Sequence, residues 1–104
     1  MAARIENPIF AKLLIESGAK INEPDNAGNT PLHSAADDWH NLDTIKYLVL
    51  KGADLNTKNH NGKTPRDLAR TEGRNFFARY KANPEKVKKE TEAHLKKVFK
   101  KSYK

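Results

Sequence analysis

Apolar residues recur at steps of three and four along this chain, with polar residues between them. Three short stretches each carry a compact apolar set: Phe10, Leu13 and Leu14, then Ile45, Leu48 and Val49, then Phe76, Phe77 and Tyr80. Steps of three and four place side chains on one face of an α-helix. The pattern therefore predicts three amphipathic helices that each bury one side.

A fourth apolar stripe lies near the end of the chain, surrounded by lysines. It consists of Val87, Thr91, Leu95, Val98 and Phe99. Asn83 and Pro84 stand before it, and both residue types are favoured where a helix begins. We expect a C-terminal helix that lays its apolar side over the third stretch, residues 76–80. The alternative is a basic helix that projects from the rest.

Two further helices are predicted by threonine-proline pairs at positions 30–31 and 64–65. A threonine hydroxyl at the N-cap accepts a hydrogen bond from a free amide, and a proline at the first helical position loses none. Asp67 stands three residues after the second threonine and forms a short-armed capping box. His33 takes that position in the first copy. Small alanines follow each pair and allow close helix packing.

Several motifs return with one spacing. The sequence "GNTPLHSAA" from Gly28 is followed 34 positions later by "GKTPRDLAR" from Gly62, and the pairs "GA" at 18 and 52 keep the same distance. Glycine suits the left-handed position that ends a helix, and "NAGN" and "NHNG" predict tight turns. The shared spacing predicts a repeated unit of one turn and two short helices.

Such a unit resembles the ankyrin repeat. The resemblance is carried by "LLIESGAKIN", "DNAGNTPLHSAA" and "YLVLKGADLNTKNHNGKTPRDLA". It implies an all-α fold, an ankyrin-repeat solenoid of helix-turn-helix units joined by short hairpin loops. Residues 1–82 are expected to hold a partial first, a central and a terminal repeat, and residues 83–104 the basic amphipathic C-terminal helix.

Departures from the family pattern are informative. The spacing of 34 implies one extra residue in "DDWHNLD", where Trp39 replaces a glycine, while Arg66 stands where the family carries a leucine. A polar residue at Arg66 suits a terminal repeat, whose outer side meets water. Because stacks need about three repeats, we expect the last piece of a longer ankyrin protein rather than a whole chain. Self-association through the first repeat is the other way to cover its face.

Composition sets limits on chemistry and location. Hydrophobic residues make up 37% and charged residues 32% of the chain, which fits one soluble domain. Since there is no cysteine, a disulfide, a thiolate zinc site and a thiol nucleophile are excluded. The longest apolar run, "IFAKLLI", is far shorter than a membrane span. We expect an intracellular protein of the cytoplasm or nucleus, with secretion as a host-directed effector as the alternative.

Charge gathers at the C-terminal end. Residues 81–104 hold nine lysines against three glutamates, so they carry almost all of the formal net charge of +7. The lysines of interest on the predicted helix are Lys88, Lys89, Lys96, Lys97, Lys100 and Lys101. Lysine-rich helices bind nucleic acids and anionic membranes, which gives a second candidate function.

The sequence offers no convincing set of nucleophile, base and orienting group, so we expect neither an enzyme nor a cofactor. A metal site is conceivable from His33, Asp37, Asp38, His40 and Asp43. Such nitrogen and oxygen ligands without a defined second shell are a weak signal, and His33 is better explained by hydrogen bonds at a helix start. We therefore expect no metal site.

The resemblance implies that hairpin tips and the exposed side of the first helix in each repeat bind a protein partner. In this chain those positions are Asn26, Ala27, Asn29, Ser34, Asp37, Asp38, Trp39, His60, Asn61 and Lys63. Trp39 has two equal interpretations. It is either an anchor for the partner, as tryptophans are at many interfaces, or it folds back on Leu42 or on the neighbouring repeat.

Overall fold

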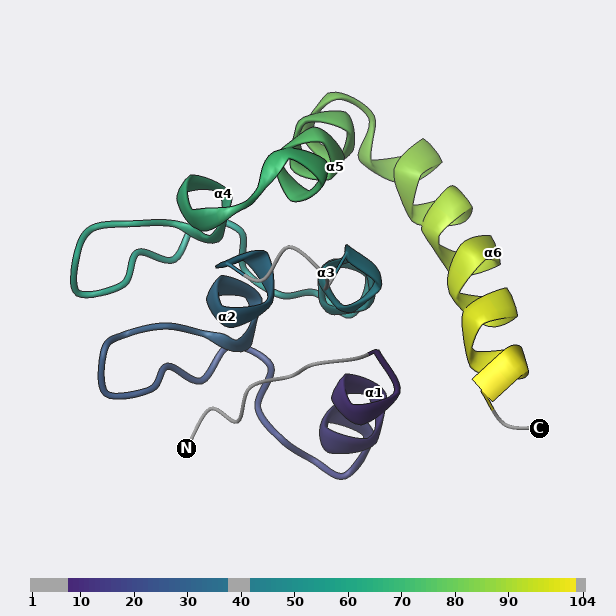
Figure 1. The fold of residues 1–104 in the computed structure, drawn as a ribbon, viewed down its shortest axis with the longest axis horizontal. Coiled ribbons are helices and arrows are strands. Elements are labelled where there is room, and N and C mark those ends of the chain that lie inside the picture. The colour runs from purple at the N-terminus through teal and green to yellow at the C-terminus, as the bar shows by residue number, and fades with distance from the viewer. Residues whose placement is uncertain (1–7, 38–41, 103–104) are drawn as a thin grey trace.

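The computed structural model describes residues 8–37 and 42–102, and within these residues the regular structure is entirely helical. Figure 1 shows the helices as they follow along the chain. Their bounds are α1 Pro8–Glu16, α2 Pro31–Asp37, α3 Leu42–Leu50, α4 Pro65–Leu68, α5 Thr71–Ala82 and α6 Pro84–Ser102.

The first five helices form two layers. α2 and α4 lie against each other in one layer, while α1, α3 and α5 form the second layer beside them (Figure 1). The pairs α2–α3 and α4–α5 are successive helical hairpins, and α1 occupies the place of a second helix in an earlier unit. Thr30 and Thr64 therefore precede equivalent, stacked helices, and the predicted all-α solenoid is confirmed.

The predicted helix ends are formed by glycines with positive φ. Gly18 has φ 101° and Gly52 has φ 95°, and residues other than glycine rarely adopt such backbone angles. The amide of Ala53 donates a hydrogen bond to the carbonyl of Leu48 at 2.9 Å, and the matching bond after the earlier glycine is 3.0 Å. Both turns satisfy carbonyls that the helix leaves unpaired, as in the Schellman motif.

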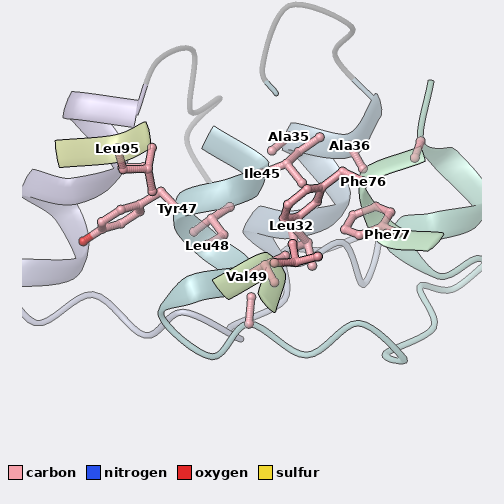
Figure 2. Close-up of a cluster of buried hydrophobic side chains, with 14 residues drawn as sticks. Leu32, Ala35, Ala36, Ile45, Tyr47, Leu48, Val49, Phe76, Phe77 and Leu95 are labelled. Atoms are coloured by element: carbon pink, nitrogen blue, oxygen red, sulfur yellow. The ribbon is translucent and has the colours of Figure 1, made fainter. Parts of the chain in front are cut away.

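Buried side chains from every described repeat form one core (Figure 2). The predicted residues that are buried in it are Ile45, Leu48, Val49, Phe76 and Phe77, whereas Leu14 and Tyr80 are half-buried. The prediction for Leu13 is wrong, since it is 52% exposed while Ala11 is fully buried. Residues two apart lie about 200° apart round a helix, so the buried face of α1 runs through Ala11, Leu14 and Ile15. The side chain of Phe10 lies outside the described part.

The unit formed by α4 and α5 differs from the expected pattern in its first helix. α4 makes a single turn and stops at Ala69, whose ψ of 141° is extended. The side chain of Arg74 donates to the carbonyl of Ala69 at 2.9 Å and to that of Asp67 at 3.2 Å. An arginine from α5 thus satisfies carbonyls that a longer helix would have paired internally.

α6 packs on the stack. Its predicted apolar stripe is confirmed, because Val87, Thr91 and Leu95 are buried. The prediction that α6 packs over residues 76–80 of α5 is incomplete, because α6 packs on α3 as well as on α5. The ring of Phe99 meets the ring of Tyr47 edge-on, with 5.7 Å between centroids.

The second half of α6 therefore runs back along the outer layer of helices (Figure 1). Two polar contacts accompany this path. Nε2 of His94 lies 2.7 Å from a carboxylate oxygen of Asp43 near the start of α3, and Nζ of Lys12 in α1 lies 5.6 Å from the centroid of the Phe99 ring. Because α6 contacts more than one repeat, it works as a strap across the stack.

Candidate protein-interaction surface

The loop before α2 is shaped by one aspartate. A carboxylate oxygen of Asp25 accepts hydrogen bonds from the amides of Ala27 and Asn29, each at 2.9 Å. The amide of Asp25 also donates to the carbonyl of Asn29 at 2.9 Å, which closes the hairpin. With the backbone held in this way, the side chains of Asn26 and Ala27 are exposed at the tip.

The loop before α4 repeats this arrangement with an asparagine. The side-chain oxygen of Asn59 accepts from the amides of Asn61 at 2.9 Å and Lys63 at 3.0 Å. The amide of Asn59 donates to the carbonyl of Lys63 at 2.8 Å. His60, Asn61 and Lys63 have exposed side chains, so both predicted hairpins present side chains while their backbones are paired internally.

Hydrogen bonds join the two hairpins. The amide of His60 donates to the carbonyl of Ala27 at 2.9 Å, and the side-chain amide of Asn59 donates to the side-chain oxygen of Asn29 at 2.8 Å. Gly28 passes close to His60, because a Cβ at Gly28 would lie 2.7 Å from the His60 ring. The two loops therefore form one continuous edge, which Figure 1 shows on the side of the molecule away from α6.

Asn29 and Asn59 illustrate what the sequence analysis missed. Asn29 was expected to contact a partner, yet its half-buried side chain bonds the next hairpin. Asn59 and Asp25 were not singled out, although each shapes its own loop. Their positions, 34 apart, carry the repeat spacing, and this signal could have revealed them.

His33 connects the repeats from within. It is fully buried, and its Nδ1 accepts a hydrogen bond from the amide of Thr30 at 3.0 Å. Nε2 lies 2.8 Å from the carbonyl oxygen of Lys63 in the next repeat. Since a carbonyl only accepts, the proton is on Nε2. The predicted helix-start role is confirmed, and both ring nitrogens are engaged by protein atoms.

Two members of the considered metal set, His33 and Asp43, have other partners. His33 is occupied as described, and Asp43 pairs with His94 on α6. Asp38 and His40 lie outside the described residues. Among residues 8–37 and 42–102, no cluster of three or more histidine, cysteine or acidic side chains is placed to hold a metal ion.

The exposed end of α2 is tied to the terminal repeat. Ser34 is half-buried and Asp37 is exposed. Nε of Arg70 donates to the Asp37 carbonyl at 3.3 Å, and its guanidinium lies 3.9 Å from the Asp37 carboxylate. The positive charge of Arg70 therefore lies beside the Asp37 carboxylate. The other predicted site residues here, Asp38 and Trp39, lie outside the described residues.

Two aspartates have lowered pKa values, and both lie at repeat junctions or helix starts. The pKa of Asp67 lies below its usual value of 3.8 because the backbone amide and hydroxyl of Thr64 bond its carboxylate. The pKa of Asp54 is lowered by the amide of Asn56, which donates to it at 2.8 Å. The ionised forms of both side chains therefore stabilise the local backbone.

The tail lysines of α6 are well placed for contact with another molecule. The side chains of Lys88, Lys89, Lys96, Lys97 and Lys100 are exposed, as is that of Lys86. The side chain of Lys101 lies outside the described part. No helix among the described residues has both the length and the apolar character needed to cross a bilayer.

Comparison with known proteins places this geometry in a family. A family model described as ankyrin repeats (3 copies) matches residues 1–59. The chain is 46% identical to the human protein phosphatase 1 regulatory subunit 27 over 57 residues, which are 55% of this chain and 36% of that protein. It is 36% identical to the potassium channel AKT1 of Arabidopsis thaliana over 72 residues, 69% of this chain and 8% of the channel.

A third relative, alpha-latrocrustotoxin-Lt1a of Latrodectus tredecimguttatus, is 38% identical over 86 residues, 74% of this chain and 6% of the toxin. The chain thus matches only a minor part of the length of each of these relatives. Three observations indicate the same family: the repeated helical hairpins, the glycines that end their helices, and the family match over more than half of the sequence. The chain belongs to the ankyrin repeat family, whose repeats are protein-interaction modules and are generally non-catalytic.

Proposed function

We propose that this chain is a non-catalytic protein-binding module whose binding surface is the edge formed by the two hairpins, together with the exposed side of α2. The observation that supports it most directly is the ladder of hydrogen bonds between the hairpins, from His60 to Ala27 and from Asn59 to Asn29. A surface that is already ordered loses little conformational entropy when a partner binds.

The exposed side chains of this edge are polar. The first hairpin presents Asn26, and the second presents His60, Asn61 and Lys63. Asparagine, histidine and lysine side chains favour an interface with many hydrogen bonds and few apolar anchors. The partner is therefore a protein with a polar, hydrogen-bonding contact surface, and its binding is expected to tolerate trapped water.

Site-specific photo-crosslinking tests this assignment. A photoreactive residue is placed at Asn26 or Asn61, and the matched control carries it at Glu92 on α6, which is also exposed. We expect one partner to be captured from both hairpin positions and not from Glu92. Asn61→Asp should weaken capture of the partner by the photoreactive residue at position 26. Equal capture from Glu92, or capture that no hairpin substitution changes, would contradict the proposed surface.

A further inference from the structure

The outward side of α6 carries a continuous row of positive charge. At 3.6 residues per turn, Lys86, Lys89, Lys96, Lys97 and Lys100 fall within a sector of about 100°. We name these five residues the lysine face. The sector lies opposite the buried stripe of Val87, Thr91 and Leu95, and all five lysines are exposed. Within the described part of the chain, no carboxylate forms an ion pair with them.

The lysine face is uniform in chemistry. Lys86 and Lys100 lie about 21 Å apart along the axis of a regular helix. Between them the sector contains only lysines and Ala93, without arginine or an aromatic residue. Arginine forks read guanine edges and aromatic rings stack on bases, so neither mode of base recognition is available. The lysine face is suited to a dense anionic surface that is recognised by charge alone.

The buried side of α6 limits how an anionic partner can contact the helix. It is already occupied, because Val87, Thr91 and Leu95 are buried against α3 and α5. α6 can therefore touch a partner only along its outward side and the flanks beside it, and it cannot lay an apolar side into a bilayer. A flat surface accepts a helix along its whole length, whereas a groove encloses it.

Acidic residues beside the lysine face favour the same conclusion. Glu85 and Glu92 lie on one flank of the sector, and Glu90 lies on the other flank with its charge paired to Arg79 at 2.6 Å. An enclosing groove would bring phosphates against Glu85 and Glu92. A planar surface that touches only the lysine face leaves both glutamates at its margin, where repulsion is screened by salt.

We propose that the lysine face docks the protein on an anionic lipid surface, by electrostatic attraction and without insertion. In Figure 1 α6 lies at the opposite side of the molecule from the hairpins. A protein held on a membrane by the lysine face would therefore keep its hairpin edge turned away from the lipid. Each lysine near such a surface strengthens binding by about fivefold.

Vesicle co-sedimentation tests the proposal with the full chain. The probe is vesicles of phosphatidylcholine and phosphatidylserine in roughly a three-to-one ratio, compared with pure phosphatidylcholine. The variant K89Q/K96Q/K100Q removes three lysines of the face. The control K20Q/K51Q/K58Q removes three exposed lysines that lie outside α6, and both variants have the same net charge.

We expect binding to the phosphatidylserine vesicles alone, lost at high salt, and weakened by roughly a hundredfold in K89Q/K96Q/K100Q. The control variant should bind like the unchanged chain. Equal binding by the two variants, or binding to pure phosphatidylcholine, would overturn the proposal. So would tight, salt-sensitive binding to a DNA duplex with no binding to the vesicles, which would assign the lysine face to nucleic acid.

Discussion

The packing of α6 can be tested with one substitution, Leu95→Ala. Leu95 is 2% exposed and lies at the Tyr47 end of the core (Figure 2). Removing a buried leucine side chain beyond Cβ costs about 2–5 kcal/mol of the free energy of unfolding, from lost transfer energy and the cavity left behind. If α6 instead projected into water, the same change would be close to neutral, because alanine is a better helix former than leucine.

Urea denaturation followed by far-ultraviolet circular dichroism measures the difference. With an m-value of about 2 kcal/mol/M, a loss of about 2 kcal/mol moves the midpoint down by about 1 M. Lys96→Ala is the matched control, since Lys96 is the exposed neighbour of Leu95 on the same helix. A Leu95→Ala midpoint that coincides with the Lys96→Ala midpoint would refute the packing of α6 on the stack.

The contact of α6 with α3 needs a separate test, because α5 alone could bury Leu95. The rings of Phe99 and Tyr47 meet edge-on, and such aromatic pairs contribute about 0.5–1.5 kcal/mol beyond their buried area. A double-mutant cycle of Phe99→Leu and Tyr47→Leu should therefore give a coupling energy within this range. Additive effects of the two changes would contradict the path of α6 across α3.

Three further changes probe the repeats themselves, each measured by urea denaturation. His33→Leu replaces the imidazole with an apolar side chain and leaves the buried amide of Thr30 unpaired, so we expect a loss of about 1–3 kcal/mol in the free energy of unfolding; a loss below about 0.5 kcal/mol would contradict the connecting role. Gly28→Ala should cost at least about 1 kcal/mol, because φ is 82° and the added Cβ meets the next hairpin; an unchanged midpoint would refute this. Asp67→Asn should destabilise the protein near neutral pH and less so in acid, because a carboxyl with a lowered folded-state pKa contributes stability above its ordinary value of 3.8 and loses it as the pH falls further; an equal deficit at both pH values would oppose this reasoning.

The sequence was sufficient to predict the parts of the fold that depend on local chemistry. Gly18 and Gly52 end their helices as expected, since only glycine adopts their positive φ without strain. Thr64 and Asp67 form the expected capping box, with bonds of 3.2 and 2.9 Å. In each case the residue type and its neighbours within four positions determine the conformation.

The features that local chemistry did not predict depend on distant contacts. The apolar stripe of α6 showed which side would be buried, but not that Phe99 would reach Tyr47 on α3. The single turn of α4 is accompanied by hydrogen bonds from Arg74 in the next helix to the carbonyls of Asp67 and Ala69. Neither contact has a spacing that the sequence alone reveals.

The candidate surface shows the same division. Exposure of Asn26, His60 and Asn61 at the hairpin tips follows from their place in the turns. The pairing of Asn29 with Asn59 does not, because it requires two loops to be in register across repeats. An asparagine that looks available for a partner in one repeat can therefore be used to align the next.

The strap formed by α6 also limits where recognition can occur. Its buried stripe covers apolar surface on α3 and α5, the outer layer of the stack, while the exposed Arg66 gives α4 a polar outer side. Large apolar side chains are thus largely buried within the molecule, and Leu13 is the large hydrophobic residue that remains exposed among the described residues. Recognition is left to polar and charged surfaces, which favours hydrogen bonding at the hairpin edge and electrostatic attraction at the lysine face. Binding at both surfaces should consequently weaken as salt is added, but more steeply at the lysine face, where attraction comes from charge alone.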